Sequence, residues 1–392
     1  MLKKSSTPIP RSIWALGFVS LFMDLSSELI HSLLPVFMVT TLGASVLTVG
    51  LIEGIAEATA QIVKIFSGAI SDFLGRRKLL LLLGYGLAAV SKPLFPLADS
   101  MLTVFTARLL DRIGKGIRGA PRDALIADLA PANIRGTCFG LRQSMDTLGA
   151  FMGPLTAILL LLLLNGDMQL VLWVAVIPAF IALLLIVVYV EEPADISGVN
   201  QFHSPLKWSV LKRFPRAYWW VVVIGAFFTL ARFSEAFLVL RAQQMGLPLT
   251  WIPMVMVVMS LSYALSAYPA GILSDRWNKK YLLALSLLWL ILADFILAQT
   301  LNISVLMLGV ALWGLHMGFS QGILATLIAE STPPEFKGTG FGLFNFVSGV
   351  LMLLASLIAG WLWDSAGAEF TFYCGAGFAF LAMILLAVKQ RA

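Results

Sequence analysis

The chain has 392 residues, of which 59% are hydrophobic and 12% are charged, and its mean hydropathy is +0.91. A soluble domain of this length could not bury so much apolar surface, so the composition excludes a soluble protein and predicts an integral membrane protein. The net charge of +6 does not indicate nucleic-acid binding, because the basic residues are concentrated in particular connections between apolar segments.

Apolar stretches follow one another along the whole chain, and each is long enough for a transmembrane helix of about 20 residues. Twelve such helices are predicted, in chain order, at residues 12–39, 46–71, 78–97, 101–126, 137–164, 168–190, 217–243, 250–274, 280–299, 303–329, 339–363 and 368–388. The first helix is expected to be retained rather than cleaved as a signal peptide, because it contains Asp24 and Glu28 and lacks a small-x-small cleavage site.

The basic residues mark one side of the expected bundle. Most of the 27 Lys and Arg residues lie in alternate connections, whereas the intervening connections contain none; the latter lie near residues 41–45, 165–167, 246–249, 300–302 and 364–369. Positively charged connections remain on the cytoplasmic side of a membrane. The pattern therefore predicts a multi-pass inner-membrane protein with both termini in the cytoplasm.

Two segments of the first half return in the second half. Residues 68–77 resemble residues 271–280, with an offset of 203 from Asp72 to Asp275, and the segment around Asp128 resembles that around Glu330, with an offset of 202. Nearly equal offsets indicate an internal duplication. We expect a six-helix bundle at 1–190, a cytoplasmic linker at 191–216 with a basic segment along the lipid headgroups, and a second bundle at 217–392.

The duplicated segment carries a known signature. Residues 68–77 read Gly-x-x-x-Asp-x-x-Gly-Arg-Arg, residues 108–116 place an arginine before alternating glycines, and residues 149–154 read Gly-x-x-x-Gly-Pro. Together these motifs resemble the major facilitator superfamily, over nearly the whole chain. Residues 24–28 and 111–123 are similar to a bacterial subgroup whose substrates are mostly unassigned. The resemblance implies an all-α membrane protein of two pseudo-symmetric six-helix bundles that works by rocker-switch alternating access.

The resemblance also implies gates on the cytoplasmic side. Asp72 is expected to face the start of the helix near residues 338–339, where a negative charge is favoured, with Arg76 or Arg77 reaching an acid. The second copy of the loop is expected to act in the same way. The expected gate residues are Asp72, Arg76, Arg77, Asp128, Asp275, Lys279 and Glu330.

Ionisable residues also occur inside the predicted helices, where each costs ~2.5–3.5 kcal/mol unless it faces a cavity or a partner. In the superfamily the first, fourth, seventh and tenth helices line the central path, and many of these charges fall there. The expected substrate-binding residues are Arg108, Arg112, Lys115, Arg232 and His316, since guanidinium groups suit carboxylates and phosphates. The expected proton-coupling residues are Asp24, Glu28, Glu57 and Glu235, because a neighbouring cation controls the protonation of a buried carboxyl.

Permanent ion pairs are the alternative interpretation of these charges. Asp24 or Glu28 could pair with an arginine of the predicted helix 101–126, Arg142 with Asp146, and Arg232 with Glu235. Asp294 is expected to be a packing residue or to form a local pair.

The sequence thus predicts a secondary active transporter that uses a proton gradient to move a small polar, anionic organic solute, such as an organic acid or a polycarboxylate metal chelator or siderophore. One alternative is a proton antiporter that exports drugs or siderophores, indicated by residues 149–154. Another is a divalent-metal transporter that uses Asp24, Glu28 and His31. No enzyme activity, cofactor or nucleic-acid partner is expected, and the expected partners of this monomer are its substrate, protons and the lipid bilayer.

Overall fold

The computed structural model describes residues 8–192, 213–333 and 336–388, and the described elements are all helices. The first half contains α1 (Arg11–His31), α2 (Leu34–Thr40), α3 (Val46–Leu74), α4 (Arg77–Ser91), η1 (Lys92–Leu94), α5 (Met101–Leu129), η2 (Ala132–Ile134), α6 (Arg135–Leu163), α7 (Met168–Val174) and α8 (Val176–Tyr189). The second half contains α10 (Arg216–Ala231), α11 (Ala236–Gln244), η3 (Leu249–Trp251), α12 (Met254–Arg276), α13 (Lys279–Gln299), α14 (Ile303–Ser331), α15 (Lys337–Ala366) and α16 (Ala368–Val388). The basic segment expected along the headgroups falls largely on residues 193–212, outside the described residues.

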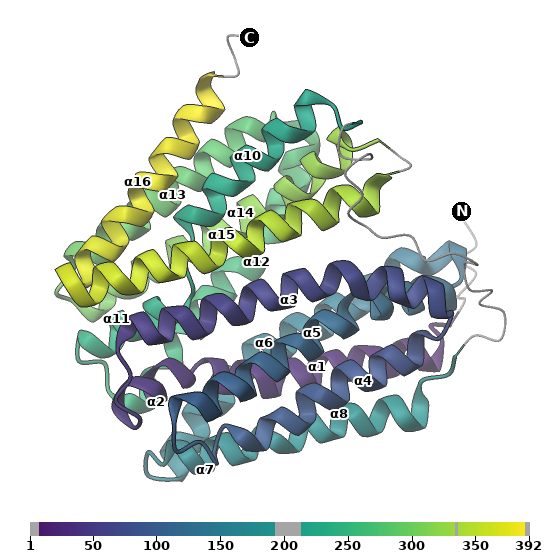
Figure 1. Cartoon of the computed structure of the whole chain (residues 1–392), viewed down its shortest axis with the longest axis horizontal. Coiled ribbons are helices and arrows are strands. Elements are labelled where there is room, and N and C mark those ends of the chain that lie inside the picture. Colours follow the sequence, from purple (N-terminus) through teal and green to yellow (C-terminus); the bar gives the residue numbers. More distant parts are fainter. Residues whose placement is uncertain (1–7, 193–212, 334–335, 389–392) are drawn as a thin grey trace, which may run out of the picture.

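Ten segments are long and apolar enough to cross a membrane, counting α1–α2, α7–α8, α10–α11 and η3–α12 as one segment each. Two further helices do not meet this criterion, because α4 has only 15 residues and α5 carries many charged side chains. Both nevertheless lie within the first bundle, where α4 packs against α5 and α8, and α5 packs against α3 (Figure 1). The chain is a multi-pass membrane protein, and its arrangement agrees with the twelve helices predicted.

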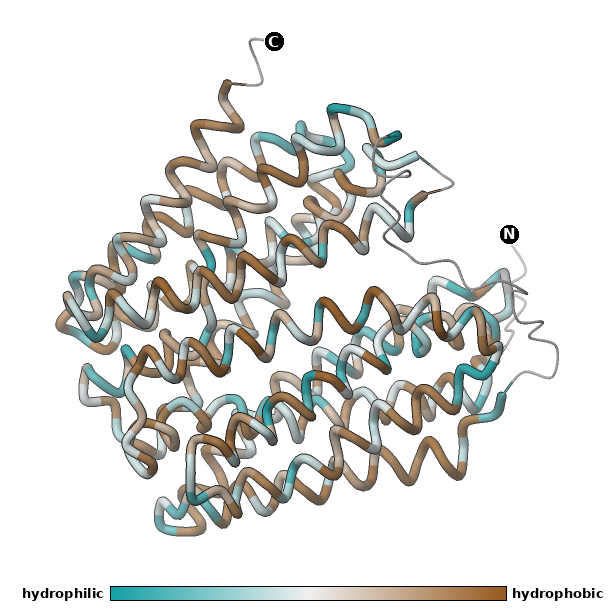
Figure 2. The backbone as a smooth tube through the Cα atoms, in the orientation of Figure 1, coloured by the Kyte–Doolittle hydropathy of each residue, from teal (hydrophilic) through white to brown (hydrophobic). Residues whose placement is uncertain are grey.

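The helices form two groups that follow the order of the chain. Figure 1 shows the helices of the first half on one side and those of the second half on the other, with α3 and α15 side by side between them. Figure 2 shows mostly hydrophobic residues along the helices, and hydrophilic residues at their ends and inside the first bundle, along α5. This distribution suits a bundle whose outer surface faces lipid and whose charges face inward.

Besides 168–190, which divides into α7 and α8 at Ala175, two other predicted continuous helices are interrupted. The segment 12–39 divides into α1 and α2 at Ser32 and Leu33, and the segment 217–243 divides into α10 and α11 across residues 232–235. Pro35 follows the first break and has no backbone N–H to donate. At the second break the backbone N–H of Ser234 donates to Ser356 Oγ of α15, at 3.3 Å, instead of to its own helix. The breaks occupy corresponding places in the two halves.

Glycines let α3 and α15 approach closely along their length. A Cβ atom added to Gly54 would lie 3.0 Å from Leu353 Cα, and one added to Gly360 would lie 2.7 Å from Leu47 Cα. Small residues at such positions allow the backbones of two transmembrane helices to come into contact. The antiparallel pair α3–α15 therefore forms a continuous seam between the two halves.

The two ends of the molecule differ. At the end opposite the N-terminus, here called the outer end, α2 packs against α11, and the rings of Phe237 and Trp363 lie 5.9 Å apart (Figure 1). There the Asp364 carboxylate of α15 accepts hydrogen bonds from the backbone N–H groups of Val46 and Leu47, at 3.2 and 2.8 Å. These bonds join the C-terminal end of α15 to the N-terminal end of α3, so the halves are tied together at the outer end.

Candidate functional site

A cavity of about 500 Å³ lies between the two halves. Its lining residues come from α3, α10, α14, α15 and the break after α10; they are Glu57, Gln61, Lys64, Phe228, Thr229, Arg232, His316, Ser320, Gln321, Leu324, Ala325, Phe341, Phe344, Asn345, Ser348 and Met352. From Glu57, midway along α3, the cavity extends toward the inner end of the molecule, where the N-terminus lies and α15 begins (Figure 1). Both halves of the chain thus contribute to one site.

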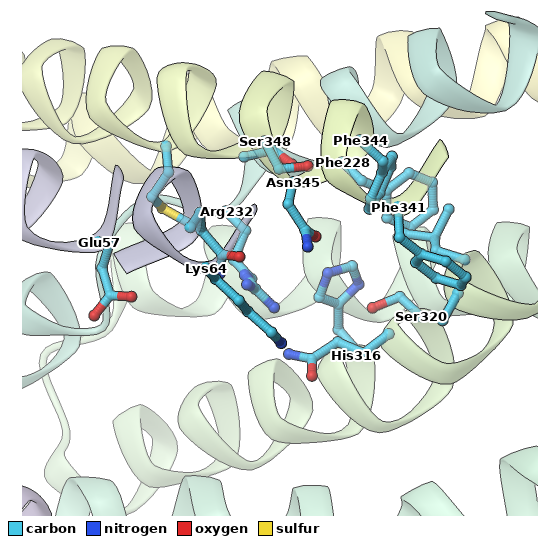
Figure 3. Close-up of a pocket in the computed structure, with 16 residues that line it drawn as sticks. Glu57, Lys64, Phe228, Arg232, His316, Ser320, Phe341, Phe344, Asn345 and Ser348 are labelled. Carbon is cyan, nitrogen blue, oxygen red and sulfur yellow. The ribbon is translucent and has the colours of Figure 1, made fainter. Parts of the chain in front are cut away.

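Two cationic side chains enter this cavity from opposite halves. Lys64 comes from α3 and Arg232 from the break between α10 and α11, and Figure 3 shows both directed into the space shared with His316 and Asn345. Among the described residues, no carboxylate lies within 4.0 Å of either cation. In particular, Arg232 does not form the ion pair with Glu235 that was one interpretation of the sequence. Both charges are available to a ligand.

His316 has a fixed orientation in this cavity. Its Nδ1 lies 2.9 Å from the carbonyl oxygen of Ser286 on α13, and its ring stacks against Phe228 with centroids 5.9 Å apart. A carbonyl can only accept a hydrogen bond, so Nδ1 carries the hydrogen and Nε2 is left as an acceptor in the neutral ring. Polar groups fixed in this manner, beside the aromatic rings of Phe341 and Phe344, are typical of a site for an organic molecule.

The arginines of α5 are bound to acids of α3. Arg108 is 1% exposed and its guanidinium lies 2.6 Å from Glu53, while Arg112 lies 3.1 Å from Glu57. A second cavity of about 160 Å³ brings six predicted residues together: Glu28, Glu57, Arg112, Lys115, Arg232 and Glu235. His31 also lines it and lies 3.3 Å from Glu28. Arg108 lines neither cavity, so the structure does not bring this predicted substrate ligand to the site.

Asp24 meets a second acid. Its carboxyl on α1 forms a hydrogen bond with Asp146 on α6, and Asp146 lies 3.4 Å from Arg142 and 3.6 Å from Arg122. The predicted Arg142–Asp146 pair therefore exists, but it is part of a larger cluster. Two carboxyls so close together repel each other when both are ionised, so this arrangement favours a proton on one of them.

Among the described residues there is no group of three His, Cys, Asp or Glu side chains that could hold a metal ion. Glu28 and His31 are neighbours, but Asp24 is turned to Asp146 instead. The divalent-metal interpretation therefore has no ligand cluster in this part of the chain.

The sequence model of the Major Facilitator Superfamily matches residues 16–354 and 236–392. The chain belongs to this superfamily. It is accordingly a transporter rather than an enzyme, and members of the superfamily bind small molecules within the membrane.

Known relatives and solved structures are similar to all or part of this chain. An uncharacterized MFS-type transporter of Methanocaldococcus jannaschii is 31% identical over 384 residues, which cover 96% of this chain and 94% of the relative. The multidrug resistance protein MdtH of Photorhabdus laumondii is 30% identical over 156 residues, or 40% of this chain and 38% of that protein. A crystal structure of a POT family transporter in complex with 5-aminolevulinic acid is similar in fold, with a TM-score of 0.81, 12% identity and coverage of 97% and 96%.

The residues predicted from the superfamily signature lie at the inner end. Arg77 contacts both Asp128, at 2.5 Å, and Asp72, at 3.2 Å, and in the second copy Lys279 lies 2.5 Å from Glu330. Arg76 and Asp275 form no ion pair within the described ranges. Asp72 likewise makes no hydrogen bond to the start of α15 there, so in this conformation the expected contact with residues 338–339 is not made.

Several residues that line the larger cavity were not among the substrate-binding residues predicted from the sequence. Lys64, Gln61, Gln321 and Asn345 all line the larger cavity. Gln61 and Lys64 follow Glu57 at helical spacing, which places the three on one stripe of α3. That stripe was the available signal, but a stripe on one helix does not reveal which helix it faces.

Proposed function

We propose that this protein is a proton-coupled secondary transporter for a small organic anion, in the inner membrane with both termini in the cytoplasm. The observation that carries the proposal is the pair of cations Lys64 and Arg232, which enter one cavity from opposite halves and have no carboxylate partner among the described residues. Unpaired charges in a membrane protein are expensive and usually mark a substrate path. A carboxylate or phosphate between them would bind both halves at once.

The rest of the cavity supports an organic rather than an inorganic anion. A volume of about 500 Å³ is within the range of sites for small organic ligands, about 300–1,000 Å³. Gln321, Asn345 and His316 Nε2 offer hydrogen bonds to hydroxyl, amide or carboxyl groups, and Phe341 and Phe344 offer an apolar wall. The expected substrate class is an organic acid with additional polar groups, which includes polycarboxylate chelators.

Coupling to protons is proposed at the Asp24–Asp146 pair. In this proposal the two acids share a proton, and Arg122 and Arg142 lie beside the pair. Movement of α1 relative to α6 would separate the two acids, and each alone beside an arginine would then release the proton. Because the cavity extends to the end that carries the basic connections, this state is proposed to be inward-facing.

Ligand binding to the purified protein tests the anion proposal. Thermal stabilisation by organic acids is expected, and by sugars or cationic drugs it is not. Arg232→Gln and Lys64→Gln are each expected to weaken binding about tenfold or more, because a hydrogen bond to a charged group contributes about 1.5–3 kcal/mol. Arg216→Gln, at the exposed start of α10, is the matched control and should bind as the wild type does. Stabilisation by neutral or cationic compounds alone would contradict the proposal.

Proton coupling is tested separately in proteoliposomes. Asp24→Asn is expected to abolish accumulation driven by an inward proton gradient while exchange of substrate across the membrane continues. Accumulation by the wild type that ignores the imposed gradient would remove the coupling proposal and leave the anion site intact.

Export of drugs is the second candidate function. It is favoured by the partial similarity to MdtH and by the Gly-x-x-x-Gly-Pro motif at residues 149–154. The ligand screen distinguishes the two, since a drug exporter would be stabilised by apolar cations and would not depend on Arg232.

A further inference from the structure

Asp294 is a buried acid outside the site described above. It lies in the last third of α13, its exposed fraction is 0%, and neither of its carboxyl oxygens has a hydrogen-bond partner among the described residues. Of the two roles expected from the sequence, packing or a local pair, the local pair is not formed within these residues. A buried polar group without a partner is rare in folded proteins and calls for a physical explanation.

The carboxyl of Asp294 lies beside the break between α10 and α11. A Cβ atom added to Gly375 of α16 would be 2.7 Å from Asp294 Oδ2, 3.1 Å from the ring of Phe233 and 3.2 Å from the carbonyl oxygen of Ala231. The carboxyl, the ring and the carbonyl thus surround one point on α16 where a side chain is absent. Ala231 is the last residue of α10, and no backbone N–H of the described residues beyond the helix end donates to its carbonyl.

In the part of the chain that the structure describes, no cation forms an ion pair with Asp294. On α16 the titratable neighbour is the thiol of Cys374. His316 of α14 and Arg241 of α11 both bond to backbone carbonyls elsewhere on α13, and neither forms an ion pair with Asp294. An ionised carboxylate in such surroundings would have neither a counter-charge nor a hydrogen-bond donor.

We propose that Asp294 is a second proton-binding site, and that its protonated carboxyl holds the free Ala231 carbonyl at the break between α10 and α11. A neutral carboxylic acid has an O–H group to donate, and the carbonyl at the end of α10 is an acceptor without a backbone donor. The bond formed by this proton replaces the helical hydrogen bond that the break removes.

The proton, rather than a metal cation, is the ligand that suits this site. A sodium ion needs several oxygen ligands around a space of its own, whereas Asp294 lines neither of the two cavities described above. A proton needs no space. Because Asp294 is fully buried beside the ring of Phe233, exchange of this proton with water requires the surrounding side chains to move.

The location connects this proton to the transport site. Arg232 and Glu235 lie on either side of Phe233, and both line the cavities between the halves. Movement of the break would therefore displace the cavity residues and uncover Asp294 together. This consequence for transport rests on the proposed function, whereas proton binding itself does not depend on the substrate.

The pH dependence of thermal stability tests the proton site in the purified, ligand-free protein. In the wild type, loss of the Asp294 proton leaves a buried charge without a partner, so the melting temperature falls as pH rises from 5 to 8. Asp294→Asn, which is uncharged and can still donate to the Ala231 carbonyl, is expected to lose that part of the fall. Cys374→Ser is the control for the neighbouring thiol and should keep it. An unchanged pH dependence in Asp294→Asn, or stabilisation of the wild type by sodium at fixed pH, would overturn the proposal.

Infrared spectroscopy provides a second measurement that does not require the Asn variant to fold. In an Asp24→Asn background, which removes the shared proton of the Asp24–Asp146 pair, the C=O stretch of a protonated carboxyl is still expected at pH 7. Its absence there would overturn the proposal. Binding of organic acids by Asp294→Asn is expected to match the wild type, so failure of the anion proposal and failure of this one are distinguishable.

Discussion

Asp364 is expected to hold the two halves together at the outer end. The Asp364 carboxylate accepts hydrogen bonds from two backbone N–H groups, those of Val46 and Leu47, which belong to the other half of the chain. Asp364→Ala removes both bonds and the negative charge that faces the N-terminal end of α3. The variant is expected to open the outer end more often than the wild type does.

The size of this effect follows from the geometry. An acceptor at a helix N-terminus contributes about 0.5–2 kcal/mol, and a negative charge there contributes about 0.3–1 kcal/mol when exposed. Both bonds lie at an exposed position, so a loss of about 1–2 kcal/mol is expected. A change of this size enlarges the population with an open outer end by a factor of about five to thirty. Asp364→Asn keeps one acceptor and should have an intermediate effect.

Distance measurements between spin labels can detect this shift. Thr41, at the end of α2, and Gln244, at the end of α11, are both exposed and lie on opposite halves at the outer end, and each can be replaced by cysteine. The background requires Cys138→Ser and Cys374→Ser, because these are the native thiols. The Ala variant is expected to show an increased population at longer distance.

Asp167 provides the matched control. Its carboxylate accepts from the backbone N–H of Leu170 at 3.0 Å and so caps α7, but both residues belong to the same half. Asp167→Ala should reduce thermal stability by a similar amount and leave the distance distribution unchanged. Equal distributions in wild type and Asp364→Ala, or an equal shift in Asp167→Ala, would refute the reasoning.

Two further predictions concern packing and buried charge. Gly54→Val is expected to cost about 1–3 kcal/mol of stability, because its side chain overpacks against Leu353. Gly322→Val is the control and should melt close to the wild type, since no atom lies within 4 Å of its added Cβ. Equal melting temperatures of the two variants would contradict the close contact between α3 and α15. Arg108→Gln is expected to cost about 3–5 kcal/mol, because the fully buried Glu53 loses its arginine and keeps only His31, at 3.8 Å. The double variant with Glu53→Gln should recover much of the thermal stability. Failure of the double variant to recover would mean that the pair is not the source of the loss.

The architecture could be predicted largely from the sequence. Hydropathy located the membrane segments, and the superfamily resemblance is confirmed by the match to residues 16–354 and 236–392. The breaks at Ser32–Leu33 and at residues 232–235 were not predicted, because the hydropathy of a segment does not change where its backbone hydrogen bonds change partner. The boundaries 1–190, 191–216 and 217–392 of the two bundles and the linker stay a prediction.

The site was predictable only in part, for a physical reason. Periodicity shows that Glu57, Gln61 and Lys64 share a stripe of α3, but the rotation of α3 against its neighbours decides which of them meets an arginine. Thus Arg112 lines the smaller cavity but pairs with Glu57, at 3.1 Å, whereas Lys64 of α3 enters the larger cavity without a carboxylate partner among the described residues.

Contacts between ionisable side chains on different helices were the hardest feature to predict from the sequence. Asp146 was paired with Arg142 because they are four residues apart, yet it also meets Asp24 from α1. Packing or a local pair was expected for Asp294, and its closeness to α10 and α16 could not be inferred from the sequence. Such contacts depend on tertiary packing, which local spacing does not encode.

The interruption between α10 and α11 allows the short helix α11 to move separately from α10. Helical hydrogen bonding is missing across residues 232–235, so the nine residues of α11 can pivot without breaking a helical bond of α10. α11 packs against α2 at the outer end, and its N-terminal end follows the break that contains Arg232, which lines the cavity. A tilt of this short helix would therefore change its contact with α2 at the outer end and the position of Arg232 in the cavity together, without rotation of an entire half of the molecule.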